Sequence, residues 1–283
     1  ISQGLASQKI IDDPWLFILL AKLRGMETRV RAGEYQLEPG LTADELLEKF
    51  IQGNAIQYKL TIIEGWSFRQ MLAAIAEDPV IESTLQGKTD TEIMTLLGQP
   101  DQHPEGLFFP DTYRFPKGTS DLDFLRRAYQ VMQKHLEREW SQRVPGLPLK
   151  SSYEALILAS IIEKETGAGF ERPLIAGVFV ERLKRKMRLQ TDPTIIYGLG
   201  PDFDGDIRYR DLRMDTPYNT YLRAGLTPTP IALPGLDSIR AALNPASTEA
   251  LYFVSKGDGT HKFSATLDEH NAAVSRYQLN KKK

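Results

Sequence analysis

The chain has 283 residues, a length that suggests about two domains, and its composition of 41% apolar and 25% charged residues is ordinary for a folded protein. Its 35 basic and 37 acidic residues nearly balance, which disfavours a nucleic-acid-binding protein, for which a basic excess is expected. The absence of cysteine excludes a disulfide framework, thiolate zinc sites and a cysteine nucleophile. The longest strongly apolar run, 15–21, is far shorter than the roughly 20 residues that span a bilayer. We therefore expect no membrane-spanning segment in this sequence. The start at Ile1 rather than Met suggests that an upstream anchor or signal is missing.

The first predicted helix begins near Asp12 or Asp13, with Pro14 in its first turn, and ends by Gly25. Proline is favoured there because the first turn of a helix does not use its backbone N–H groups. After this helix the sequence contains an internal repeat.

Segments 35–47 and 60–72 form a weak internal repeat. Each contains a short alternating strand, a glycine turn, a capping box and an amphipathic helix. In a capping box the hydroxyl at the helix start accepts a bond from the amide three residues on, and the side chain there reaches back. Small strand–helix units of this kind are expected to make up the N-terminal third. The two boxes are Thr42 with Glu45 and Ser67 with Gln70.

The middle section, 80–150, is predicted to be mostly helical. Residues 121–140 have apolar side chains at helical spacing, and the breaker-rich segment 144–148 ends that helix. Segment 104–113 is too aromatic for an ordinary loop and too rich in Pro and Gly for a helix.

The last portion contains predicted helices, a long irregular region and a hairpin. Because helices and strands are segregated rather than alternating, the expected fold class is α+β. The expected division is a first subdomain at 1–57, a second strand–helix unit with a helical connection at 58–150, and a catalytic domain at 151–283. The expected elements of that domain are helices 153–166 and 172–186, irregular residues 187–235, and strands 251–254 and 261–264.

Several common chemistries have no motif in this chain. It lacks a phosphate-binding G-x-x-x-x-G-K-[ST] loop, a G-x-S-x-G elbow, an S-x-x-K pair and an H-E-x-x-H zinc motif. The histidines have no metal-ligand spacing, so we interpret them as surface or packing residues and expect neither a metal nor a cofactor. These histidines are His103, His135, His261 and His270.

The most informative acidic residue is Glu163, which follows eight nearly apolar residues, 155–162. On a helix it shares a face with Ala159 and Ser160, whereas Glu165 points about 200° away, so the two acids are not a side-by-side pair. A carboxyl among small and apolar neighbours loses hydration, which favours the protonated form that a general acid needs. The same residues also fit the solvated end of a core helix, so this helix alone leaves both interpretations open.

Two later segments add groups suited to a sugar polymer. Residues 187–198 set Gln190, Asp192 and Tyr197 around what we interpret as a rigid Asp-Pro turn, and 216–221 supplies Asn219 with two tyrosines. Amides and carboxylates hydrogen-bond sugar hydroxyls, and aromatic rings cover the apolar faces of pyranoses. Each segment alone is also compatible with an ordinary turn and buried tyrosines, but together they suggest a glycan cleft.

At this point the chain resembles a known family, the endolytic murein transglycosylases, also called YceG-like proteins. The resemblance is carried by four ordered blocks and covers essentially the whole chain, with the N-terminal repeat similar to the LysM-like part of the family. The blocks are 105–113 (EGLFFPDTY), 159–166 (ASIIEKET), 188–193 (RLQTDP) and 218–221 (YNTY).

The resemblance implies cleavage of the β-1,4 bond between N-acetylmuramic acid and N-acetylglucosamine in nascent peptidoglycan, without water, leaving 1,6-anhydro ends. It implies that Glu163 is the general acid and then the base. Four residues, Gln190, Asp192, Tyr197 and Asn219, are expected to bind substrate or orient Glu163. Glu105 is a further cleft candidate, although a turn stabiliser before Gly106 is an equal reading. Glu165 is expected to be structural and paired with an arginine, and a helper role for Asp192 stays open.

The implied partners are peptidoglycan strands and peptidoglycan synthases (penicillin-binding proteins), with no nucleic acid. The implied location is the periplasmic face of the inner membrane of a bacterial cell envelope, with membrane attachment only through an anchor outside this sequence. Two alternatives are a non-catalytic peptidoglycan-binding protein and a muramidase-type hydrolase.

Overall fold

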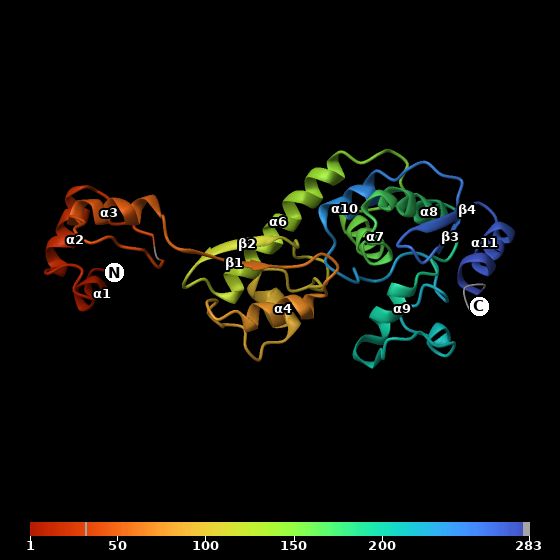
Figure 1. The fold of residues 1–283 in the computed structure, drawn as a ribbon, viewed down its shortest axis with the longest axis horizontal. Coiled ribbons are helices and arrows are strands. Elements are labelled where there is room, and N and C mark those ends of the chain that lie inside the picture. Colours follow the sequence, from red (N-terminus) through yellow and green to blue (C-terminus); the bar gives the residue numbers. More distant parts are fainter. Residues whose placement is uncertain (32, 280–283) are drawn as a thin grey trace. The chain divides into compact units, whose positions relative to one another are not determined.

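The computed structural model describes residues 1–31 and 33–279, in which helices are combined with two small two-stranded sheets (Figure 1). This arrangement confirms the α+β class. No helix in those residues is long and apolar enough to cross a membrane. The helices are α1 Ser2–Ser7, α2 Pro14–Leu23, α3 Ala43–Gln52, α4 Phe68–Glu77, α5 Asp90–Leu96, α6 Asp121–Ser141, α7 Ser152–Glu165, α8 Arg172–Lys184, α9 Asp192–Leu199, α10 Leu236–Leu243 and α11 Leu267–Val274. The strands are β1 Gln57–Thr61, β2 Thr112–Pro116, β3 Tyr252–Ser255 and β4 His261–Ser264.

The chain forms two compact units, each of which gathers separate stretches of sequence. The three-part division expected from the sequence follows chain order instead, and both it and the LysM-like assignment of 1–57 stay predictions. Unit 1 contains Ile1–Leu60, Ile75–Thr84 and Thr112–Asp121, and unit 2 contains Thr61–Ala74, Leu85–Asp111 and the residues from Leu122 onward.

In unit 1 the helix starts follow the local signals. Asp13 caps α2 by accepting from the backbone of Trp15 at 2.8 Å, and the capping box of α3 is formed. The strand expected at 35–37 is not formed, since Tyr35 and Leu37 pack against the helical core instead. That core is made of Leu5, Phe17, Ala21, Leu46, Leu47 and Phe50.

The pairing of β1 with β2 corrects the expectation for the middle section. Residues 112–116 lie in the portion expected to be mostly helical, but they form a strand in which Tyr113 and Phe115 are buried and their neighbours are more exposed. Alternating aromatic residues favour a half-buried strand.

In unit 2, α7 is the central helix, and it buries the whole stretch 155–162. It packs against α8, α9 and α10. The hydroxyl of Ser160 accepts from the backbone of Ile231 at 3.0 Å, which fixes the segment before α10 against α7. The end of α7 is thereby surrounded by chain from distant parts of the sequence.

The region expected to be irregular, 187–235, contains α9. Asp192 and Pro193 are the first residues of this helix, not a rigid turn, because proline in the first turn costs no hydrogen bond. The predicted hairpin is confirmed: β3 and β4 are antiparallel, with Phe253 opposite Phe263.

Candidate active site

The carboxylate of Glu163 lies at the C-terminal end of α7, where the chain leaves the helix core. Its side chain is only 5% exposed. One oxygen, Oε1, accepts from Nη2 of Arg172 at 3.1 Å, and Oε2 accepts from the backbone N–H of Gly235 at 2.9 Å. Arg172 begins α8 and Gly235 precedes α10, so three helices meet at this group.

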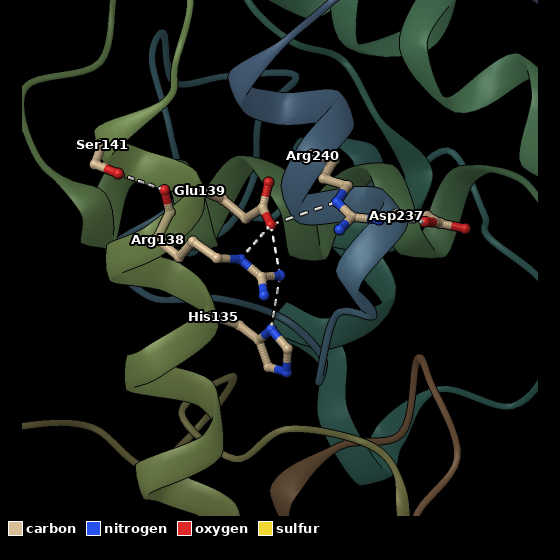
Figure 2. A network of polar contacts seen from close by, with 6 residues as sticks. All are labelled: His135, Arg138, Glu139, Ser141, Asp237 and Arg240. Carbon is tan, nitrogen blue, oxygen red and sulfur yellow. Dashed lines mark hydrogen bonds and ion pairs between the residues drawn. The ribbon is translucent and has the colours of Figure 1, made fainter.

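Helix α10 is itself fixed by a charged network with α6 (Figure 2). The buried carboxylate of Glu139 on α6 accepts from Nε and Nη2 of Arg138 at 3.0 and 2.7 Å, and its ion pair with Arg240 of α10 is 3.4 Å long. Because Gly235 is the residue immediately before α10, this network helps to set the position of the amide that binds Glu163.

A second carboxylate approaches the same arginine. Oε2 of Glu64 lies 3.9 Å from Nη2 of Arg172. Burial raises the pKa of Glu64, and the charge of Glu163 raises it further. The sequence gives one sign that Glu64 differs from its surroundings: the aligned position in the first copy of the internal repeat is Pro39, so the carboxylate is specific to the second copy.

Glu165 lies on another side of α7 and has a different partner. Its carboxylate accepts from the hydroxyl of Thr191, and burial raises its pKa to about 7. The charge of the Arg182 guanidinium opposes this rise in the pKa of Glu165, while Glu163 forms the ion pair with Arg172. The bond to Thr191 ties the segment that contains Gln190 and Asp192 to the end of α7.

Glu105 and Tyr197, both expected at the site, are brought together. Glu105 is buried, and it accepts from the backbone of Phe68 at 2.9 Å and from the Tyr197 hydroxyl at 3.2 Å. Burial raises the pKa of Glu105 to about 7 and also raises the pKa of Tyr197. Tyr197 in turn meets Tyr218 edge-on, with ring centroids 4.9 Å apart. Glu105 thus links the start of α4 to α9.

The other three predicted residues differ in what their side chains can do. Gln190 and Asp192 are exposed, and Asp192 accepts from the Tyr221 hydroxyl at 2.5 Å. Asn219 is buried, and its amide is fully used by four backbone bonds of segment 212–222: it donates to the carbonyls of Leu212 and Met214 and accepts from the N–H groups of residues 221 and 222. Asn219 therefore shapes this loop, whereas Gln190 and Asp192 have exposed side chains, Asp192 while bonded to Tyr221.

Two of the histidines make contacts within the fold that differ in kind. His261 pairs with Glu171 at 2.7 Å, and the ring of His135 stacks on Phe109 with centroids 4.4 Å apart. In residues 1–31 and 33–279 no group of three or more His, Asp or Glu side chains is arranged to hold a metal ion.

Comparison with known proteins identifies relatives along the whole chain. The YceG-like family matches residues 1–276. The endolytic murein transglycosylase of Bacillus subtilis (strain 168) is 34% identical, and the alignment covers 98% of this chain and 81% of that protein. The protein of the same name from Streptococcus pneumoniae serotype 2 is 28% identical and covers 98% of this chain, which spans 56% of its length.

A solved structure matches as well. The crystal structure of a YceG-like protein from Listeria monocytogenes has a TM-score of 0.62 and 32% identity, covering 96% of this chain and 93% of that one. The match extends over both helical and strand regions and is therefore not confined to one motif. This chain belongs to the YceG-like family.

Proposed function

We propose that this protein cleaves the bond between N-acetylmuramic acid and N-acetylglucosamine within peptidoglycan strands, without water, and leaves 1,6-anhydro ends. The observation that carries this proposal is the desolvated carboxylate of Glu163, held by Arg172 and Gly235. It is supported by relatives named endolytic murein transglycosylases that align with 98% of the chain.

The reaction needs one group that first gives and then takes a proton. The protonated Glu163 gives its proton to the glycosidic oxygen as the bond from C1 to that oxygen breaks. The C6 hydroxyl of the muramyl residue then attacks C1, and its proton passes to the carboxylate. Glu163 thus regains a proton from the C6 hydroxyl in place of the one that stays on the departing oxygen, so no water is consumed and no second carboxylate is needed as nucleophile.

The neighbouring residues would fix the acid and the sugar. Arg172 and the Gly235 amide hold both oxygens of Glu163, which limits its rotation and aims it at one position. We assign Gln190 and Asp192 to contacts with sugar hydroxyl or acetamido groups, since both side chains are exposed. We assign Tyr197, Asn219 and Glu105 to holding the surrounding loops, because they are partly or fully buried and bonded within the protein.

We further propose that the protein works in the bacterial cell envelope, at the periplasmic face of the inner membrane, on strands made by peptidoglycan synthases. An anchor outside this sequence would hold it there. The LysM-like residues 1–57 would add binding to the same polymer.

Glu163→Gln tests the catalytic assignment, because the amide has the same shape but cannot give and recover a proton. We expect release of muropeptides from purified sacculi to fall by roughly 10²- to 10⁴-fold, the usual contribution of general acid–base catalysis. Binding to sacculi should be retained, measured by co-sedimentation.

The matched control is Glu181→Gln, a partly exposed carboxylate on α8 that forms ion pairs with Lys184 and Arg185. It should release muropeptides at the wild-type rate. Wild-type activity in Glu163→Gln would reject the assignment, and binding without release by the wild type would favour a non-catalytic binding protein.

A further inference from the structure

Arg172 faces an imbalance during the proposed reaction. Its side chain is only 13% exposed, and its Nε is buried without a hydrogen-bond partner among the residues that the structure describes. While Glu163 is ionised, the guanidinium has a carboxylate at 3.1 Å. Once Glu163 takes up the proton that it must give to the substrate, Arg172 loses that partner. A largely buried cation without a counter-ion is costly.

Glu64 is placed to relieve this imbalance. The same nitrogen, Nη2 of Arg172, lies within 3.9 Å of a Glu64 oxygen as well as within 3.1 Å of a Glu163 oxygen. One cation thus stands between two carboxylates from different parts of the sequence. A small rotation of the guanidinium would exchange one partner for the other.

The backbone holds Glu64 in this position. The next residue, Gly65, donates to the carbonyl of Leu233 at 2.8 Å, and Leu233 donates back to Trp66 at 2.7 Å. The carbonyl of Gly65 also accepts from Nζ of Lys164 at 3.1 Å, so the Glu64 loop is tied both to the segment before α10 and to the end of α7.

Gly235 lies against both carboxylates. Its amide binds Glu163, and a Cβ at this position would lie 2.0 Å from Oε1 of Glu64. The Glu64 carboxylate therefore lies directly against this turn and would have to shift to make room for a side chain at position 235. Although the Glu64 side chain is 49% exposed, its carboxylate lies against the backbone of the residue that binds Glu163.

We propose that Glu64 is a positioning residue of the active site, serving as the alternative anionic partner of Arg172 whenever Glu163 carries the proton. This inference rests on the proposed function. Glu64 contacts neither bond that changes; it acts through Arg172, which returns to Glu163 as the proton leaves. The groups that face Glu64 are Arg172, Glu163, Asp237 and, through Gly65, Lys164.

Glu64→Gln should lower kcat by roughly 10- to 100-fold, a range expected when a catalytic group is displaced, with little change in KM. Removing a negative charge makes the site lose its proton more readily, so the alkaline limb of the pH–rate profile should move to lower pH. Glu64→Asp should restore part of kcat. In an Arg172→Gln background the change at Glu64 should have no further effect, because the two residues act as one unit.

The control is again Glu181→Gln, which removes one carboxylate from α8, away from the Arg172 guanidinium. A wild-type kcat and pH profile in Glu64→Gln, matching this control, would overturn the proposal. So would equal losses of kcat in the wild-type and Arg172→Gln backgrounds. Thermal unfolding of each variant excludes misfolding as the cause.

A measurement without turnover separates this inference from the proposed function. The pKa of the Glu64 carboxyl, followed by ¹³C NMR, should fall in Glu163→Gln, because the charge of Glu163 raises it and Arg172 is freed to pair with Glu64. An unchanged Glu64 pKa would show that the two carboxylates do not share Arg172, and would overturn the inference even for an active enzyme. An inactive wild type that nevertheless shows this coupling would reject the proposed function alone.

Discussion

Glu105 is a buried carboxyl whose proton is linked to stability. Its pKa is raised to about 7 mainly by burial, whereas the unfolded chain releases this proton near 4.5. Between those pH values the folded state binds more protons than the unfolded state, so the stabilising contribution present below pH 4.5 is lost as pH rises to 7. Glu165 acts in the same direction in the same window.

Glu105→Gln should therefore flatten the fall in stability between pH 4.5 and 7. The free energy of unfolding of the variant, relative to that of wild type, should rise by about 3 kcal/mol across this window, since each pKa unit corresponds to about 1.4 kcal/mol. Urea unfolding at a series of pH values measures this free energy. Parallel curves for the two proteins would show that the Glu105 proton is not linked to folding, and a part of the slope should remain because of Glu165.

At the scale of elements, α8 contains a glycine that helix propensity alone would not select. A Cβ on Gly177 would lie 2.4 Å from the carbonyl oxygen of Ala246, so the helix packs with its backbone directly against that segment. Alanine is favoured over glycine in a helix by about 1 kcal/mol. At this position the clash outweighs that preference, because backbone cannot move aside as a flexible side chain can.

Gly177→Ala is expected to destabilise the protein by roughly 1–3 kcal/mol, the usual range for overpacking. Gly4→Ala is its control, because Gly4 lies in α1 with nothing within 4 Å of the added methyl. That variant should be as stable as wild type or slightly more so. The denaturation midpoint should fall in Gly177→Ala and stay the same or rise slightly in Gly4→Ala. A higher midpoint in both variants would show that Gly177 has room for a side chain.

The elements also show which parts of the fold the sequence can predict. Helix starts are encoded within a few residues, so the caps at Asp13, Thr42 and Ser67 are formed as expected. The predictions for the residues of β2 and α9 were wrong. The strand was missed because strand pairing depends on a distant partner. The helix was missed because proline fits the first turn of a helix as well as a tight turn. Local pattern therefore predicts where helices begin better than which segment pairs with which.

The candidate site likewise contains one residue that the sequence predicts and others that only the fold reveals. Glu163 stands out in the sequence because an apolar helix leads directly into it. Its partners Arg172 and Gly235, and the second carboxylate Glu64 beside Arg172, stand out far less, because each comes from a different segment and only the tertiary fold brings them together. The exposed or buried state of Gln190 and Asn219 likewise depends on packing that no short motif encodes.

On the scale of the whole molecule, the composition fits the proposed substrate. Net charge is near zero, and a glycan requires hydrogen bonds and aromatic surfaces more than a basic surface. Both compact units draw on separate parts of the chain, so the family match over residues 1–276 describes an arrangement of the entire sequence. The central proposal, cleavage without water, is therefore tested with all 283 residues of the chain.

That claim is tested most directly by digesting purified glycan strands with the intact protein in water enriched in oxygen-18, followed by mass spectrometry of the new ends. Glu163→Gln, treated in parallel, serves as the blank. Cleavage without water predicts new ends that lack the mass of one water and carry no oxygen-18. Reducing ends that contain one oxygen-18 atom would identify a hydrolase and contradict it.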